Sequence, residues 1–175
     1  MLDLVVRSDR VVTPHGVGAY DVAIQGDKIV AVAAPDTLTG DTARTIDATG
    51  KIVVPGGIDP HTHCKWPVPF PGTSGTLSAG PEQVSRAALF GGTTTLLDFA
   101  AWESGESLQQ TIQRRDGDWA GQCYTDYAFH VVLTGGPPPD VLAQIPETIQ
   151  AGFPSFKMFT TDITPSRRGL SLIHI

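Results

Sequence analysis

The stretch Pro55-Gly-Gly-Ile-Asp-Pro-His-Thr-His63 ends an apolar run, residues 51–58, with two histidines two residues apart. Alternate side chains of a strand point to the same face, so we expect His61 and His63 to point one way and Thr62 the other. Two imidazoles on one face at the carboxyl end of a strand are a natural start for a metal site. A bare His-X-His is equally compatible with two ordinary histidines at a turn.

From residue 55 onward, apolar strands alternate with helices. We expect strands at 56–63, 93–99, 124–133 and 153–160, and helices at 81–90, 106–116 and 139–150. Repeated strand–helix units with near-continuous apolar strands imply a parallel sheet covered by helices. Four such units form half of a (β/α)₈ barrel or part of a doubly wound sheet. Because no Gly-X-Gly-X-X-Gly loop follows a strand, a dinucleotide-binding fold has no support.

Residues 1–54 show a different pattern, with short strands and tight turns. We expect strands at 2–7, 10–13, 21–25, 28–33, 44–47 and 51–54. Gly26-Asp27 reads as a hairpin turn, and Ala48-Thr-Gly50 separates the last two strands in the same style. This segment is therefore interpreted as a small antiparallel β unit that needs a partner sheet or domain to bury its apolar face.

Composition excludes several classes of protein. The chain has 175 residues, of which 41% are hydrophobic, as in an ordinary globular domain. Its net charge of −6 argues against a nucleic-acid partner. No apolar run is long enough to cross a membrane, and the amino terminus lacks a secretory signal. Cys64 and Cys123 have no metal or redox spacing and indicate free thiols, so we expect a cytoplasmic protein.

A second candidate for chemistry is Lys157, a lone lysine in the apolar stretch Ser155-Phe-Lys-Met-Phe159. Lysine is rarely buried without a partner, and the simplest interpretation is a strand-end lysine that reaches water. Alternatively, an amine that burial keeps neutral can react with carbon dioxide to form a carbamate. The two carbamate oxygens could then bridge two metal ions.

These features together resemble those of a known group of enzymes. The β-rich start, the motif at 55–63, Gly91-Gly-Thr-Thr-Thr-Leu-Leu-Asp-Phe99 and the stretch at 155–159 resemble the amidohydrolase superfamily, specifically its hydantoinase and dihydropyrimidinase branch. The resemblance extends to about residue 169. It implies an α/β fold in which residues 1–54 form part of a small β-sandwich. Residues 55–169 would form the first half of a metal-dependent (β/α)₈ TIM-like barrel.

The resemblance also implies a reaction and a set of ligands. His61 and His63 would bind one of two divalent metal ions, commonly zinc, and carboxylated Lys157 would bridge both. The remaining ligands, including an aspartate that acts as general base, come from later strands in the family, so no catalytic residue is expected in this chain. Metal coordination yields a water-derived nucleophile near neutral pH, and the substrate is a small cyclic amide. Cys64 and Trp66 would contact that substrate, or simply belong to a packed loop, and the family is usually homotetrameric.

Three further residues have two possible roles each. Asp59 either holds a metal ligand in place or caps a turn beside Pro60. Asp98 either lines the site or makes structural hydrogen bonds, and the second role is favoured. His130 lies in an apolar strand and is expected to be a histidine with satisfied hydrogen bonds.

Two departures from the family leave the substrate open. Asp162 stands where the best-known members have a tyrosine that holds the developing oxyanion, and an ionised carboxylate cannot donate that hydrogen bond. Ala79-Gly-Pro-Glu82 replaces the usual acidic pair. An allantoinase or a dihydroorotase-like enzyme is therefore an alternative, although the loop after His63 has Lys65 and no arginine. A non-catalytic scaffold is another, but such proteins generally lack the metal-binding residues kept here.

The end of the chain carries a separate expectation. Residues 170–175, Leu-Ser-Leu-Ile-His-Ile, match what a transposon-end adapter used in DNA library preparation encodes, so we expect them to be non-native. Four of eight barrel units precede them. Half a barrel has an unpaired strand edge and exposed core faces, so we expect the chain alone to be inactive and poorly soluble.

Overall fold

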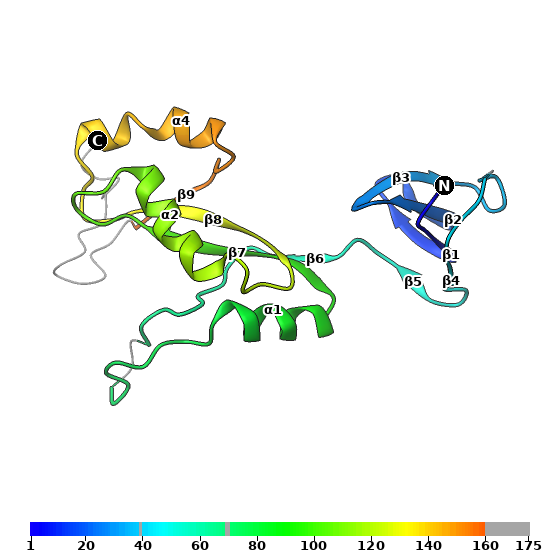
Figure 1. Ribbon diagram of the computed structural model, residues 1–175, viewed down its shortest axis with the longest axis horizontal. Helices are drawn as coiled ribbons and strands as arrows, with labels where there is room; N and C mark the ends of the chain where they lie inside the picture. The colour runs from blue at the N-terminus through cyan, green and yellow to red at the C-terminus, as the bar shows by residue number, and fades with distance from the viewer. Residues whose placement is uncertain (39, 69–70, 160–175) are drawn as a thin grey trace. The chain divides into compact units, whose positions relative to one another are not determined.

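The computed structural model describes residues 1–38, 40–68 and 71–159. The chain divides into two compact units, Met1–Pro55 and Gly56–Ile175, each with its own sheet (Figure 1). Within the described ranges, no helix combines the length and apolar character that a membrane span requires. Asp162 and the tail at 170–175 lie outside the described residues.

The first unit is a five-stranded sheet in the order β3-β2-β1-β4, with β5 also paired to β1. Its strands are β1 (Leu4–Thr13), β2 (Gly16–Gln25), β3 (Lys28–Ala33), β4 (Thr45–Asp47) and β5 (Ile52–Val53). The hairpin predicted at Gly26-Asp27 is confirmed, since β2 and β3 pair antiparallel and Gly26 has a φ of 60°, which favours glycine.

Two predictions for this unit are wrong. Strands expected at 2–7 and 10–13 form one strand, because a bulge between Ser8 and Val11 bends β1 without ending it. The last two strands do not pair with each other, as both run parallel to β1. The sheet is therefore mixed and not purely antiparallel. The turn between these two strands stays beside β1, since Ala48 N donates to Arg7 O at 2.8 Å.

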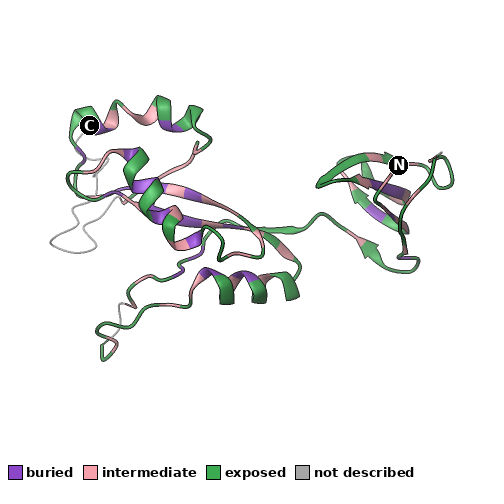
Figure 2. Ribbon diagram, viewed as in Figure 1, coloured by how far each residue is buried: buried purple, intermediate pink, exposed green. Residues whose placement is uncertain are grey.

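One set of apolar side chains in this unit is covered and another is not (Figure 2). Buried positions are Val5, Val11, Val22 and Ala23, whereas Val17, Ile29, Val30, Val32 and Ile52 are exposed. That a partner sheet or domain covers the exposed set stays a prediction.

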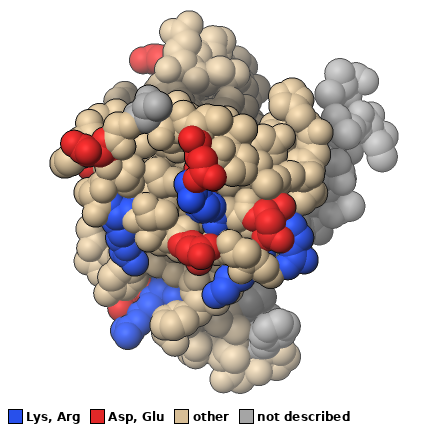
Figure 3. Space-filling view, turned by 90° about the vertical axis from the view of Figure 1, so that its right-hand side faces the viewer, with Lys and Arg blue, Asp and Glu red and all other residues tan. Residues whose placement is uncertain are grey.

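Charges of both signs are interspersed on the face of the molecule shown in Figure 3. In the first unit, Arg7 pairs with Asp21 at 2.8 Å and with Asp36 at 2.9 Å.

The second unit is a curled parallel sheet whose strands lie in chain order. It consists of β6 (Gly57–Asp59), β7 (Thr93–Ala101), β8 (Asp126–Leu133) and β9 (Phe156–Met158), joined by α1 (Pro81–Phe90), α2 (Leu108–Trp119), α3 (Pro139–Leu142) and α4 (Ile145–Gln150). Each strand pairs in parallel with the next. A doubly wound sheet would reverse its strand order, whereas this order is that of a half-barrel.

Prolines explain where the second unit departs from prediction. The helix at 81–90 is confirmed, but the single helix expected at 139–150 is wrong, since α3 and α4 are separate. Pro146 lacks an N–H for the Leu142 carbonyl, and its ring crowds that carbonyl. The first strand ends at Asp59, not at His63, because Pro60 cannot donate to the ladder.

The apolar core lies between this sheet and its helices. Members of the core from β7, β8 and α2 are Leu96, Ala100, Phe129, Val131, Leu133, Leu108, Ile112 and Trp119. Figure 2 shows buried positions along these same elements. Strand side chains alternate between faces, so Phe99 and His130, which are register partners, lie on the opposite face from this core.

Candidate metal centre

His61 and His63 lie in the loop directly after β6 and face each other. Thr62 holds this loop beside β7, because its N and its Oγ1 both donate to Leu97 O, at 2.9 and 3.0 Å. Thr62 is buried and the two imidazoles meet on the other side, as the alternation predicts. Their Nε2 atoms are 3.0 Å apart. Two nitrogens on one tetrahedral zinc, each at about 2.0–2.1 Å, lie roughly 3.3 Å apart, so the pair fits a shared ion.

The amine of Lys157 reaches the same place from the far edge of the sheet. Lys157 pairs in register with Val132, and its Nζ lies 4.1 Å from the centre of the Phe99 ring. The rings of His61 and His63 lie 4.6 and 4.8 Å from that ring. Strands β6 and β9 are separated by two others, yet the histidines of the loop after β6 and the lysine of β9 all approach Phe99, which is 3% exposed.

The electrostatic setting favours neutral nitrogens at this point. Burial lowers the pKa of Lys157. Burial also lowers the pKa of His63, against the opposing effect of the Asp98 carboxylate, which raises it. Neutral imidazole is the form that binds a metal ion, and a neutral amine is the form that attacks carbon dioxide. Among the described residues, no group of three or more His, Cys, Asp or Glu gathers as a metal site, either here or elsewhere, so the candidate centre consists of two histidines and a lysine.

His130 and Asp59 have structural partners. His130 Nε2 donates to Pro60 O at 2.9 Å, and its Nδ1 lies 2.7 Å from Ser155 Oγ. The prediction of a satisfied histidine is confirmed, and this one ties the loop after β6 to β8 and to the start of β9. Asp59 Oδ1 accepts from His61 N at 3.0 Å, a contact that forms a turn beside Pro60 and also holds the backbone of the candidate ligand His61, so both alternatives for Asp59 stay open.

Asp98 makes the structural hydrogen bonds that the sequence favoured. It is fully buried and accepts from Cys64 N at 2.8 Å, Trp66 Nε1 at 3.1 Å and Arg115 Nη2 at 2.9 Å. Sequence reasoning missed Arg115. The available signal was the position of Arg115 on the buried face of α2, where an arginine requires a buried partner. The buried residues of α2 are Leu108, Thr111, Ile112, Arg115 and Trp119.

The two residues predicted to contact substrate differ in exposure. Cys64 is 1% exposed and belongs to the apolar core, and burial raises the pKa of its thiol to about 12. Trp66 is partly exposed and lies against His63, with 4.9 Å between ring centres. Contact of either residue with a substrate stays a prediction.

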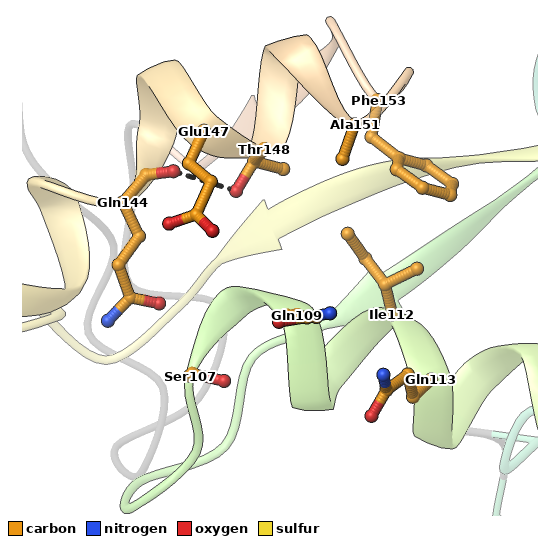
Figure 4. Close-up of a pocket in the computed structure, with 9 residues that line it drawn as sticks. All are labelled: Ser107, Gln109, Ile112, Gln113, Gln144, Glu147, Thr148, Ala151 and Phe153. Carbon is orange, nitrogen blue, oxygen red and sulfur yellow. Dashed lines mark hydrogen bonds between the residues drawn. The ribbon is translucent and has the colours of Figure 1, made fainter.

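A pocket of about 420 Å³ lies away from these histidines, between α2 and α4 (Figure 4). Ile112 and Phe153 form its apolar part, and Gln113 and Gln144 are among its polar groups. None of His61, His63 or Lys157 lines it. Because Ile112 belongs to the core between sheet and helices, this pocket is on the helix side of the sheet and is not the candidate metal centre.

The chain is similar in sequence to D-hydantoinases and dihydropyrimidinases. No model of a known protein family matches the chain. The D-hydantoinase of Rhizobium radiobacter is 33% identical over 172 residues, which are 98% of this chain and 35% of that protein. The dihydropyrimidinase of Rattus norvegicus is 37% identical over 163 residues, which are 89% of this chain and 30% of that protein.

Solved structures agree with the sequence comparison. The dihydropyrimidinase from Brevibacillus agri NCHU1002 superposes with a TM-score of 0.80 at 34% identity, covering 98% of this chain and 36% of that one. A crystal structure of a D-hydantoinase gives the same TM-score at 30% identity and 96% coverage of this chain. The chain spans about a third of the length of the curated relatives it matches.

Proposed function

The chain belongs to the hydantoinase and dihydropyrimidinase family, and from this premise we propose that the whole protein hydrolyses cyclic amides in a metal-dependent reaction that opens the ring at a C–N bond. His61 and His63 would hold one divalent ion, and carboxylated Lys157 would be the ligand shared with a second, both most simply zinc. The observation that carries the proposal is the convergence of both imidazoles and the Lys157 amine on the Phe99 ring.

In this proposal, the two histidines and Lys157 supply the metal ligands, and Phe99 packs against them. His61 and His63 offer their Nε2 atoms to one ion, and the partners of the loop keep these atoms together. The Lys157 Nζ lies over the Phe99 ring, and burial of this amine lowers its pKa and so favours its neutral form. That nitrogen bonds to the carbon of carbon dioxide and releases a proton, which leaves a carbamate with two ligand oxygens. A bound divalent ion polarises the ring carbonyl and lowers the pKa of water.

The proposal extends to the location of the protein in the cytoplasm and to its assembly. Both cysteines are free thiols, which supports a reducing, cytoplasmic compartment. The partner is a small cyclic amide and not a nucleic acid, in keeping with the net charge of −6. The whole protein is a homotetramer, and the chain alone, at about a third of its relatives' length, is inactive.

A chimera tests this function directly. Residues 1–159 replace the matching part of the Rhizobium radiobacter D-hydantoinase, and the product is assayed for hydantoin and dihydrouracil hydrolysis. We expect a zinc-dependent hydrolase whose activity falls at least about 100-fold with Lys157→Arg, because arginine cannot form the bridging carbamate.

The matched control is Lys28→Arg, which changes an exposed lysine of the first unit and is expected to keep full activity. Circular dichroism and gel filtration report whether each chimera folds. A folded chimera without activity, or one that keeps its activity after Lys157→Arg, would contradict the proposal.

A further inference from the structure

Directly after the candidate ligand His63, the chain is tied to helix α2 through one buried carboxylate. Asp98 Oδ2 accepts from Cys64 N at 2.8 Å and from Arg115 Nη2 at 2.9 Å. Arg115 also donates to Cys64 O and, through Nη1, to Asp118 at 3.1 Å. Asp98 and Arg115 are 0% and 8% exposed at their side chains, so this connection is shielded from water.

The second oxygen of Asp98 fixes the indole of Trp66. Trp66 Nε1 donates to Asp98 Oδ1 at 3.1 Å, and the Arg115 guanidinium carbon lies 5.8 Å from the indole ring centre. Backbone contacts hold the same segment, since Ser78 Oγ accepts from Trp66 N at 2.9 Å and donates to His63 O. Trp66 therefore has a fixed ring orientation before any ligand arrives.

The fixed indole meets the candidate ligand His63. Phe99 stacks on the His63 ring with an interplanar angle of 21°, and Trp66 meets the same ring edge-on at 73°. These two aromatic contacts limit the rotation of the imidazole, whose Nε2 then lies 3.0 Å from that of His61. Both Asp98 oxygens already accept hydrogen bonds from the protein, so Asp98 is not itself free to bind an ion.

Resting on the proposed function, we infer that Asp98 and Trp66 are positioning residues of the metal centre, which set its affinity by fixing the ring of His63. The path runs from Arg115 on α2 to Asp98 on β7, then to Trp66 and His63. Groups that orient metal ligands commonly change affinity by about 10- to 100-fold when altered. The indole N–H is the part of Trp66 that this role requires.

The test measures the zinc dissociation constant of the full chain by competition with a chromophoric chelator. Trp66→Phe keeps an aromatic ring beside His63 but deletes the N–H to Asp98, and we expect weaker zinc binding at a nearly unchanged melting temperature. Asp98→Asn removes acceptor capacity and the charge facing Arg115, and we expect binding weaker by about tenfold. If Asp98→Asn fails to fold, Trp66→Phe decides the question.

Trp119→Phe is the matched control, because Trp119 is fully buried in the same unit and its Nε1 has no hydrogen-bond partner within the described residues. This change should leave zinc affinity at the parental value. A folded Trp66→Phe variant with parental zinc affinity would overturn the inference, as would an equal loss of affinity in Trp119→Phe.

A metal-free measurement separates this inference from the proposed function. Nuclear Overhauser contacts between the rings of His61 and His63 report their mutual orientation without zinc, and we expect Trp66→Phe to weaken them. If the parental chain binds no zinc, the proposed function fails, and this measurement still tests the positioning. Unchanged ring contacts in Trp66→Phe would then overturn it.

Discussion

Replacing both His61 and His63 by alanine is expected to raise the zinc dissociation constant of the chain at least about 100-fold, because it removes the two nitrogens that face each other across 3.0 Å. Lys157 alone cannot hold an ion, since its amine is a weak ligand until it carries a carbamate. Equilibrium dialysis against zinc, followed by atomic absorption, measures the bound metal in the double variant and the parental chain.

His15→Ala provides the control for this experiment. His15 lies in the exposed turn between β1 and β2, in the other unit of the chain, and its loss should leave zinc binding unchanged. Parental binding by the double variant would place the metal elsewhere and remove the basis for the proposed chemistry. Equal losses from His15→Ala would indicate non-specific binding by histidines.

Asp98→Ala is expected to lower the free energy of unfolding of the second unit by about 3–5 kcal/mol. The change leaves the Arg115 guanidinium buried without its counter-charge, and it leaves Cys64 N and Trp66 Nε1 without their acceptor. A buried donor without a partner adds its own desolvation cost. Urea-induced unfolding followed by tryptophan fluorescence gives the difference.

A paired substitution shows whether the cost comes from the unpaired charge. Asp98→Leu combined with Arg115→Met removes both charges together and should recover a large part of the loss, because it leaves no isolated ion in the core. Asp118→Ala serves as a partial control, since Asp118 is considerably exposed and meets Arg115 only through Nη1. A loss below about 1 kcal/mol in Asp98→Ala would contradict the account, as that is the range of exposed pairs.

Local signals predicted much of the second unit. Proline at position 81 and Gly91-Gly92 bound α1, and the β-branched run that starts at Thr93 forms β7. The order of strand–helix units predicted a parallel sheet, because a crossover helix returns each strand in the same direction. His61 and His63 could be paired in advance for the same reason, since two residues apart on extended chain means one face.

The remaining features depend on contacts between distant parts of the chain. Strands β4 and β5 look like a hairpin locally, but each finds a better partner in β1. Pro146 marks the break between α3 and α4, because proline removes a backbone donor from a segment whose other residues have a helical pattern. The ion pair of Asp98 with Arg115 joins residues of a strand and a helix, and no spacing along the chain encodes it.

The role of Phe99 was likewise not apparent from the sequence. An aromatic residue at the end of an apolar strand reads as core, and Phe99 is indeed 3% exposed. Only the register of the sheet, which pairs Phe99 with His130 and Val132 with Lys157, puts it next to the amine and both imidazoles. Phe99 therefore connects the motif at residues 55–63 with the stretch at residues 155–159, which are separate in the sequence.

The central claim is that residues 61 and 63, in the loop after β6, and residue 157, on β9, form one metal centre at the two outer strands of a parallel sheet. Anomalous diffraction at the zinc absorption edge, from crystals of the full chain grown with zinc and bicarbonate, tests it most directly. The account predicts an anomalous peak bound by Nε2 of His61 and Nε2 of His63, with a carboxylated Lys157 in contact. A peak bound by other residues, or an unmodified Lys157 turned away from both imidazoles, would contradict it.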